Sequence, residues 1–458
     1  MMARESTSVL QQLHDELAGR IAEAAERLQV PGVVAGILLD GEEDFVSYGV
    51  TSIANPLPVD EGTLFQIGST TKTYTGTAIM MLVEQGKIDL NATVRTYLPD
   101  FTLKDEATAA NVTVLHLLNH TAGWGGDFEV DTGYGDDSLA KLVARLIEVE
   151  QESPLGERVS YNNAALCVAG RVIEVVTGKS YEQAIRDLIY EPLGLTEHFF
   201  FPWEIMTRKF AAGHTLSHGE LQVTPWYEPR GAHPPGAEHA ASVRDQMRYA
   251  RFHLGDGQGI MRPETLKQMQ TLTTPQGSGQ HGSMFGITWM LHEIDGVKFV
   301  SHGGSCRGHM SAFEMVPERN FALALNTNAR QGQELLTELT AWIFEAYLGV
   351  VEQIPDPLPL TAEELKEFTG IYDSQTGALH VSIDGDHLLG KLEINPEMGI
   401  SEEEAEATVP PLPFVILPND RFLITEGIYK NLQGAIIRND EGRVTAIDLG
   451  RVMTKREE

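Results

Sequence analysis

The sequence predicts a mixed α/β fold: an antiparallel sheet flanked by helices with a helical lobe beside it, followed by a small all-β barrel. Three observations predict this fold. A helix-like segment opens onto two strand-like segments near the start of the chain, strand-like segments return between 298 and 328, and only short strands follow a proline-rich stretch at 352–360. We therefore expect two domains, at 1–352 and 361–458.

The beginning of the chain predicts a helix and a hairpin. In residues 8–29, apolar side chains recur every three or four positions, which is typical of an amphipathic helix. Residues 33–40 and 44–50 are expected to be strands, joined by an Asp-Gly turn. Residues 69–85 predict a buried helix, because its second half is apolar nearly all round, and Gly86 is a suitable end.

The middle of the chain predicts the lobe and the rest of the sheet. From about 110 to 200 the pattern is mostly helical, and residues 199–240 are loop-rich and aromatic. Three strands are expected to complete the sheet, at 298–304, 309–317 and 321–328. A helix at 332–348 would pack on that sheet.

The last part of the chain has a different pattern. The stretch 352–360 holds three prolines and predicts a semi-rigid boundary. After a short helix at 362–368, apolar residues alternate with polar ones, as at 379–383, and turns separate short strands. About 95 residues of this kind are typical of a small barrel or sandwich.

The length and charge restrict the class of protein. A chain of 458 residues is too long for one compact core, and its length alone predicts two or three domains. The net charge of −31 opposes binding to phosphate backbones and anionic membranes, so we expect neither a nucleic-acid nor a membrane partner. The two cysteines, Cys167 and Cys306, are far apart and form no C-x-x-C pair. The sequence predicts no oligomeric state.

The start of the chain bears on localisation. The first residues lack the apolar core of a secretory signal, and the sequence contains no run of about 18 apolar residues. We expect a soluble protein of bacterial type, located in the cytoplasm or exported with its signal sequence removed.

The clearest chemical motif is Ser69-Thr70-Thr71-Lys72. Residues three apart on a helix share one face, so the Ser69 hydroxyl and the Lys72 amine are expected to be in contact. A serine hydroxyl needs a nearby base to act as a nucleophile, and a lysine can take or relay its proton if burial lowers the lysine pKa. The alternative is a helix start that Ser69 merely caps.

A second motif, Tyr161-Asn162-Asn163, lies where a helix is expected to begin. We expect a neighbouring ammonium to lower the Tyr161 pKa, so that a phenolate could act as general base. Asn163 could donate to a substrate carbonyl or hold Lys72. The alternative is an ordinary turn in which an asparagine caps the helix.

A third motif, the Ser-His-Gly-Gly-Ser segment at 301–305, is expected on a strand. Glycines inside a strand often mark the close approach of another backbone or of a ligand. Gly303 and Gly304 would let a substrate lie along this strand edge. The backbone N–H groups of Ser69 and Ser305 would then form an oxyanion hole.

In this order and spacing the three motifs resemble those of the penicillin-binding-protein and class C β-lactamase superfamily of serine hydrolases, which carry Ser-x-x-Lys, Tyr-x-Asn and Lys/His-x-Gly. The resemblance covers residues 8–350, and segments such as LLNHTAG at 117–123 agree with it. It implies a β-lactamase-like domain. The tail resembles the lipocalin-like barrel that is appended to some members.

The resemblance implies a role for each motif residue. Ser69 would be the acylated nucleophile, Lys72 its proton partner and Tyr161 the general base. Asn163 would contact the substrate amide, and Ser305 would complete the oxyanion hole. No metal or organic cofactor is implied.

The third motif departs from many members of the superfamily, in which a lysine at the position of His302 helps to hold a substrate carboxylate. A histidine is mostly neutral at pH 7, which argues against a dedicated β-lactamase or carboxypeptidase and is compatible with the aminopeptidase, esterase, amidase and acyltransferase members of the superfamily. Arg307 could restore a cation nearby.

Arg451, on a predicted barrel strand, could reach the cleft and hold a substrate carboxylate, although a surface arginine is the simpler interpretation. Trp226 and Arg230, in the loop-rich aromatic segment, are further candidates for substrate binding.

Two other features have ordinary explanations. His116 and His120 are four apart, as zinc ligands on a helix can be, but no acidic residue stands between them and their segment resembles that of metal-free members. We therefore expect no metal site. Cys306 follows the third motif directly, and a buried, inert thiol is the simpler interpretation than a reactive one.

Together these features predict a serine hydrolase that forms an acyl-enzyme on ester or peptide-like amide bonds of a small-molecule or peptide-like substrate. Three alternatives stay open. They are a thioesterase or peptide cyclase of the same superfamily, in which a tethered amine replaces water, a β-lactamase, and a catalytically inactive binding protein. The intact Ser69, Lys72 and Tyr161 argue against the last.

Overall fold

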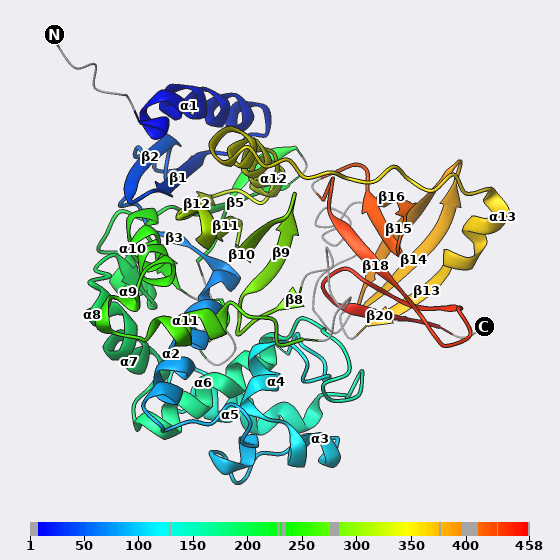
Figure 1. Ribbon diagram of the computed structural model, residues 1–458, viewed down its shortest axis with the longest axis horizontal. Helices are drawn as coiled ribbons and strands as arrows, with labels where there is room; N and C mark the ends of the chain where they lie inside the picture. The colour runs from blue at the N-terminus through cyan, green and yellow to red at the C-terminus, as the bar shows by residue number, and fades with distance from the viewer. Residues whose placement is uncertain are drawn as a thin grey trace.

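The computed structural model describes residues 8–128, 130–217, 219–226, 230, 235–237, 239–274, 284–374, 377–395, 411–427 and 429–456. It consists of a seven-stranded sheet with helices on both faces, a helical lobe below the sheet in Figure 1, and a closed barrel to one side. The predicted mixed α/β fold with a C-terminal barrel is confirmed. The domain limits at 352 and 361 remain a prediction.

The main sheet is antiparallel throughout, in the order β2-β1-β12-β11-β10-β9-β8. Its strands are β1 (Gly32–Leu39), β2 (Glu42–Gly49), β8 (Met284–Phe285), β9 (Met290–Ile294), β10 (Val297–Cys306), β11 (His309–Val316) and β12 (Phe321–Thr327). The hairpin predicted at the start of the chain therefore joins the three strands predicted near 300–328 in one sheet. Strands β1 and β12 are buried along nearly their whole length, because helices cover both faces.

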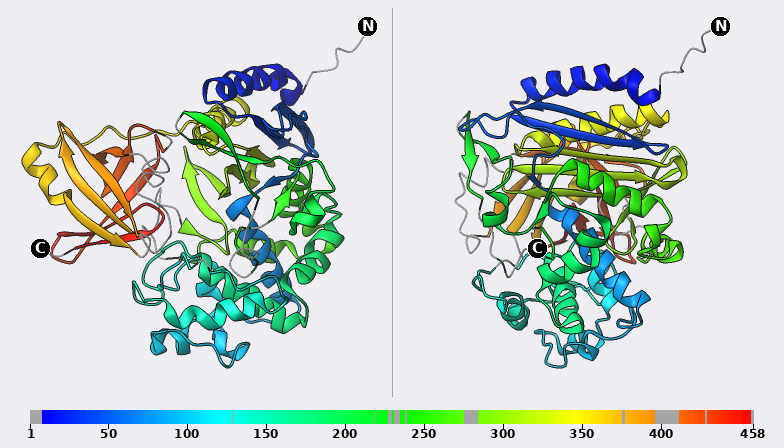
Figure 2. Two further views of the ribbon diagram at one scale, coloured as in Figure 1. Left: turned by 180° about the vertical axis from the view of Figure 1, so that it is seen from behind. Right: turned by 90° about the vertical axis from the view of Figure 1, so that its left-hand side faces the viewer.

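One face of the sheet is covered by α1 (Val9–Arg27) and α12 (Gly332–Ile343), which lie on the same side in Figure 2. Leu17 and Ile21 of α1 are fully buried in a cluster shared with the sheet, as their spacing predicts. A π-helical segment, Phe344–Leu348, continues α12 to its predicted end.

The helices of the lobe and α10 cover the other face. Helix α2 (Thr71–Glu84) runs through the middle, and its residues 71–82 are all buried, as the apolar sequence predicts. Gly86 follows α2 with φ of +70°, in the left-handed region that favours glycine at a helix end. The other helices on this side are α3 (Glu106–Asn111), α4 (Val114–Leu118), α5 (Ser138–Arg145), α6 (Asn163–Thr177), α7 (Tyr181–Ile185), α8 (Glu191–Leu193), α9 (Pro202–Ile205), α10 (Val243–Leu254) and α11 (Pro263–Met269). Of the helices that the structure describes, none has the length and hydropathy needed to cross a lipid bilayer.

Two small sheets lie outside the main one. Their strands are β3 (Phe65–Gln66), β7 (Ala240–Ala241) and β4 (His198–Phe199) in the first, and β5 (Gly213–Ser217) and β6 (Glu220–Thr224) in the second. Strand β3 leads directly into the turn that carries Ser69, so the first small sheet helps to position that turn.

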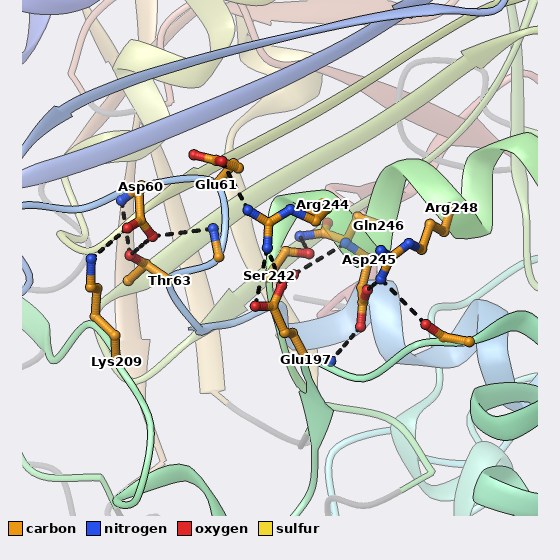
Figure 3. A network of polar contacts seen from close by, with 12 residues as sticks. Asp60, Glu61, Thr63, Glu197, Lys209, Ser242, Arg244, Asp245, Gln246 and Arg248 are labelled. Atoms are coloured by element: carbon orange, nitrogen blue, oxygen red, sulfur yellow. Dashed lines mark hydrogen bonds and ion pairs between the residues drawn. The ribbon is translucent and has the colours of Figure 1, made fainter.

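An ion-pair network fixes the segment before β3 to the start of α10 (Figure 3). The Arg244 guanidinium donates to Glu61 at 2.8 Å and to Glu197 at 3.0 Å. Ser242 caps α10 by accepting from the backbone N–H of Asp245 at 3.1 Å. The buried Asp245 carboxylate in turn accepts from the backbone N–H of Glu197 at 2.6 Å. These contacts hold together the elements that flank the first small sheet.

The C-terminal part is a closed barrel of eight strands in chain order, in which the last strand pairs with the first. Its interior is filled by apolar side chains that include Tyr372, Leu379, Phe414 and Phe422. The short helix α13 (Ala362–Leu365) precedes it, and its strands are β13 (Gly370–Ser374), β14 (Gly377–Asp384), β15 (His387–Ile394), β16 (Leu412–Leu417), β17 (Arg421–Ile424), β18 (Gln433–Arg438), β19 (Val444–Asp448) and β20 (Val452–Lys455). Of the two architectures expected from the sequence, the tail therefore forms the barrel.

Candidate active site

Ser69 and Lys72 lie in contact where the main sheet meets the lobe. Ser69 is in a 3₁₀ turn (Gly68–Thr70) directly before α2, and Lys72 is in the first turn of α2. The Lys72 Nζ donates to the Ser69 Oγ at 3.0 Å and to the backbone carbonyl of Gly236 at 2.9 Å. Thr70, not Ser69, is the N-cap of α2, and it makes no side-chain capping bond. The Ser69 hydroxyl is therefore directed to a buried amine rather than used as a cap.

Tyr161 lies directly before α6 and is surrounded by nitrogen-bearing side chains. The Lys72 Nζ is 4.8 Å from the centroid of its ring, and the Arg451 guanidinium carbon is 4.9 Å from it. The His120 ring stacks on it with centroids 4.4 Å apart, and the centroid of the His302 ring is 6.1 Å away. The second and third motifs thus meet beside the first, as their resemblance to the superfamily implies.

The prediction that this environment lowers the Tyr161 pKa is wrong. We expected a neighbouring ammonium to lower the Tyr161 pKa, but burial of the hydroxyl raises the pKa well above its ordinary value of 10.0. The nearby Ser69 hydroxyl and the Arg451 guanidinium lower it by less than burial raises it. The phenol is therefore neutral at pH 7. The Tyr161 hydroxyl is buried, and the side chain that acts on it as a hydrogen-bond partner is Ser69.

The two asparagines after Tyr161 make different hydrogen bonds. Asn162 is the N-cap of α6, and its side-chain oxygen accepts from the backbone N–H of Ala165 at 2.7 Å. Asn163 instead donates through Nδ2 to the Asp127 carboxylate at 2.8 Å. The capping interpretation of the motif therefore applies to Asn162. Asn163 is held by a carboxylate, and the structure shows this carboxylate, rather than Lys72, as its partner.

Two backbone segments touch at the predicted oxyanion hole. Gly68 has a φ of +52°, and a Cβ placed on it would lie 2.6 Å from the backbone nitrogen of Ser305. A Cβ on Gly304 would lie 1.9 Å from the carbonyl oxygen of Ile67. The Ser311 hydroxyl donates to that same carbonyl at 2.9 Å. Glycine is therefore required on both sides of the contact, which brings the Ser305 segment of β10 against the turn that carries Ser69.

Strand β10 extends past its neighbour on one side. Residues 297–301 pair with β9, whereas 302–306 pair, among the described residues, with β11 alone. Gly303 and Ser305 are exposed on this stretch. The edge that we predicted for an extended substrate is therefore free of β9 beside the candidate oxyanion hole.

His302 is buried and uncharged. Its Nδ1 lies 2.7 Å from the carbonyl oxygen of Gly303, and its Nε2 has no hydrogen-bond partner in the part of the chain that the structure describes. Burial, helped by the Lys72 charge, lowers the His302 pKa to about 3. The residue at the position of the superfamily's lysine is thus a neutral imidazole at pH 7, as we expected.

The barrel contributes to the same site through the turn between β19 and β20. The carbonyl oxygen of Gly450 accepts from the backbone N–H of Tyr161 at 3.0 Å. Arg451 donates to both oxygens of Asp127, at 2.5 and 2.7 Å. Arg451 therefore reaches the site, as one of our two interpretations held, and there it pairs with a carboxylate of the protein. Its contact with a substrate carboxylate remains a prediction.

Sequence reasoning missed Asp127 and the contact of His120 with Tyr161. Asp127 belongs to no motif, and its partner Arg451 is 324 positions away. One signal was available: a Cβ on Gly126 would lie 2.5 Å from the carbonyl oxygen of Tyr161, so the glycines before Asp127 mark a close approach. His120 accepts through Nδ1 from the backbone N–H of Asn162 at 3.0 Å, which holds its ring against Tyr161.

The contacts of Trp226 and Arg230 are with residues other than Ser69. Trp226 packs edge-on against Phe210 and His309. Arg230 is engaged by the Glu182 carboxylate at 2.8 and 3.0 Å and by Asp136 at 3.0 Å. Arg307 is exposed in the tight turn between β10 and β11, and Cys306 is a buried thiol beside it. The candidate role of the first three in substrate binding remains a prediction.

Comparison with known proteins agrees with this geometry. Residues 17–348 match the family described as Beta-lactamase. The penicillin-binding protein 4 of Amycolatopsis lactamdurans is 32% identical over 372 residues, which are 76% of this chain and 94% of that protein. The fold and the three motifs define a class, the β-lactamase-fold proteins, whose members are generally serine hydrolases. With the family match over 17–348 and this relative, the chain belongs to the Beta-lactamase family.

Solved structures show how far the fold likeness extends. The crystal structure of SurE has a TM-score of 0.76 at 24% identity, and the match covers 98% of this chain and 100% of that one. The D-amino acid amidase of Ochrobactrum anthropi, complexed with L-phenylalanine amide, has a TM-score of 0.63 at 23% identity over 74% of this chain and 99% of that one. At such identities the likeness shows the fold alone. The first match includes the barrel, which agrees with the appended domain that the sequence predicts.

Proposed function

We propose that this protein is a serine hydrolase that acts through an acyl-enzyme on ester or peptide-like amide bonds. The observation that carries the proposal is the 3.0 Å contact between the Ser69 Oγ and the Nζ of a fully buried Lys72. Burying an ammonium is costly, so a lysine held against a serine at a helix start needs a reason beyond stability. Activation of a nucleophile is such a reason.

The proposed reaction has two steps. Ser69 attacks the substrate carbonyl while the substrate lies along 302–306 of β10, and the N–H groups of Ser69 and Ser305 stabilise the developing oxyanion. The Ser69 proton passes to the Tyr161 oxygen while the phenol proton passes on to the leaving group, and Lys72 holds the hydroxyl in position. Water then attacks the acyl-enzyme by the same route and regenerates Ser69.

The proposed substrates follow from the charges around the site. His302 is neutral, so β10 lacks the permanent cation that would hold a carboxylate at that position. The Arg451 cation on the barrel side already pairs with Asp127. A neutral ester or amide group beside the scissile bond fits this distribution better than a carboxylate. The fold likeness to a D-amino acid amidase supports including amides of D-residues among the candidates.

The test is turnover of a substrate panel by the wild type and by Ser69→Ala. The panel contains p-nitrophenyl esters, amides of D- and L-amino acids, nitrocefin, and a peptidyl thioester whose linear and cyclic products are separated. We expect Ser69-dependent hydrolysis of an ester or amide. Faster turnover of nitrocefin would favour the β-lactamase alternative, a cyclic product the cyclase, and no turnover of any compound the inactive binding protein.

A further inference from the structure

We propose that a buried chain of hydrogen bonds positions Lys72 for the attack by Ser69, by fixing the backbone segment to which the lysine amine donates. The proposal rests on the proposed function, in which Lys72 holds the attacking hydroxyl. The members of the chain act through the lysine, so they are positioning residues rather than catalytic ones. We call it the Thr75 chain; it ends at the carbonyl oxygen of Pro235 and consists of the side chains of Tyr190, His239, Tyr181 and Thr75.

The position of Lys72 depends on a glycine carbonyl from a distant segment. The Lys72 Nζ donates to the carbonyl oxygen of Gly236 at 2.9 Å and to the Ser69 Oγ at 3.0 Å. The lysine stem is flexible, so a contact from outside α2 limits where its amine can lie. Glycine has more backbone freedom than any other residue, so the direction of the Gly236 carbonyl has to be fixed by its surroundings.

The Thr75 chain acts on the peptide group next to that glycine. Thr75 is three positions after Lys72 on α2, so the two side chains lie on one face of the helix. The Thr75 Oγ donates to the carbonyl oxygen of Pro235 at 2.6 Å. This carbonyl belongs to the planar peptide group that joins Pro235 to Gly236. The hydrogen bond therefore fixes the peptide plane on one side of the glycine.

The direction of each hydrogen bond in the chain follows from the first. A carbonyl can only accept, so the single hydrogen of Thr75 is used on Pro235, and the Tyr181 hydroxyl, 2.8 Å away, donates to Thr75. The Tyr181 oxygen then has no hydrogen left and accepts from the His239 Nε2, in the longest link of 3.5 Å. Burial lowers the His239 pKa well below its ordinary value of 6.5, so the ring is neutral and its Nδ1 accepts from the Tyr190 hydroxyl at 2.9 Å. Each donor has an acceptor, which favours a single arrangement of the chain.

The same segment is also anchored from two other sides. A Cβ on Gly170 of α6 would lie 2.4 Å from the Pro235 Cγ, so glycine at that position makes room for the proline ring. The backbone N–H of His239 donates to the Thr71 Oγ at 3.2 Å, and the His239 carbonyl oxygen accepts from the backbone N–H of Ile67 at 3.0 Å. The segment is therefore held at both ends, on either side of the carbonyl that Lys72 uses.

A second threonine on α2 provides a matched comparison. Thr77 is fully buried like Thr75, and its Oγ lies 2.7 Å from the Tyr249 hydroxyl and 3.3 Å from the His253 Nε2. One helix thus carries two buried threonines, each of them paired with a tyrosine. These partners of Thr77 are side chains, whereas Thr75 also bonds the backbone beside the carbonyl that Lys72 uses. Loss of the Thr77 hydroxyl tests packing alone.

The experiment measures how fast a fluorophosphonate labels Ser69, followed by intact mass, as the maximal rate constant kinact and the half-saturating concentration KI. Valine keeps the shape of threonine without its hydroxyl, and serine keeps the hydroxyl. We expect Thr75→Val to lower kinact about tenfold or more at an unchanged KI, because a displaced lysine misplaces the attacking hydroxyl. Thr75→Ser and the control Thr77→Val should keep kinact within about twofold of the wild type.

A pair of tyrosine variants tests the next link of the chain. Tyr181→Phe should lower kinact about threefold, since Thr75 keeps its bond to Pro235 but loses the donor that orients it. Tyr249→Phe removes the matching hydroxyl from Thr77 and should leave kinact unchanged. Thermal unfolding of both variants shows whether they lose similar stability. The tyrosine pair also decides the question if Thr75→Val does not fold.

The outcomes separate this proposal from the proposed function. Equal losses of kinact in Thr75→Val and Thr77→Val, or a Thr75→Ser variant as slow as Thr75→Val, would overturn the role of the chain, because packing would then account for the effect. A wild-type kinact in folded Thr75→Val would overturn it as well. A folded wild type that the fluorophosphonate does not label would overturn the proposed function, and the role of the chain with it.

Discussion

The pair formed by Arg451 and Asp127 links the barrel to the candidate active site, and its removal makes a quantitative prediction. The side chain of Arg451 is 32% exposed and that of Asp127 15%, so the pair is neither a surface pair nor a fully buried one. Surface pairs contribute about 0.2–1 kcal/mol, and losing one partner of a buried pair costs about 3–5 kcal/mol. We therefore expect Arg451→Met to lower the free energy of unfolding by about 2 kcal/mol.

A double-mutant cycle with Asp127→Asn isolates the pair. The asparagine removes the charge but keeps an oxygen that can accept from Asn163, which donates to Asp127 at 2.8 Å. Once the charge is gone, the loss of Arg451 leaves no unpaired carboxylate. Arg451→Met should therefore lower the free energy of unfolding by about 1–2 kcal/mol less in the Asp127→Asn background than in the wild type.

The assay is urea unfolding followed by fluorescence, together with kcat/KM for an ester. Burial raises the Asp127 pKa, but Arg451 and Asn163 lower it by more, so the net pKa lies below the ordinary value of 3.8. A carboxyl group with a lowered pKa stabilises the fold above its unfolded pKa and loses that effect as pH falls through the folded pKa. The coupling should thus be present at pH 7 and fade below about pH 4. Additive free energies at pH 7 would refute the reasoning, because they would mean that the two side chains do not act as a pair.

Three further predictions concern single positions. Tyr161→Phe should lower the acylation rate by about a hundredfold or more, measured by stopped flow, and a loss of less than a few-fold would remove Tyr161 from the proton path. Gly304→Ala should lower kcat/KM at least about tenfold, because its Cβ would lie 1.9 Å from the carbonyl oxygen of Ile67 and push β10 away from Ser69; unchanged kinetics would contradict the proposed oxyanion hole. Burial raises the Asp448 pKa to about 6, so its stabilising effect is complete below pH 4 and is lost as pH rises through 6. Asp448→Asn should therefore be about 2 kcal/mol more stable than the wild type at pH 8 but not at pH 4, as thermal unfolding at the two pH values would show.

Most of the fold could be predicted from local patterns. The period of Leu17 and Ile21 indicated the face that α1 buries, and the apolar run of α2 indicated a helix surrounded by other elements. The order of the strands could not be predicted in this way, because β1 pairs with β12, about 290 positions later, through contacts that no local period encodes. The choice between barrel and sandwich likewise depended on the pairing of β13 with β20.

The same distinction between local patterns and contacts over long sequence separations applies to the candidate site. Ser69 and Lys72 could be placed together because a helix fixes the distance between positions three apart. The Tyr161 pKa could not be predicted, since its direction depends on burial as much as on charge, and burial follows from packing with His120 and the barrel. Asp127 was missed for a related reason: its role depends on Arg451, which the fold brings to it from the far end of the chain.

The most direct test of the central claim, that Ser69 is an activated nucleophile, is the intact mass of the protein after incubation with a fluorophosphonate. The wild type and Ser69→Ala are treated in parallel, and a penicillin is used in a separate sample. We predict a single fluorophosphonate adduct in the wild type and none in Ser69→Ala. Labelling by penicillin as well would favour a D-peptide-like substrate, and its absence an ester or amide without the carboxylate. No fluorophosphonate adduct in the folded wild type, or equal labelling of Ser69→Ala, would contradict the claim.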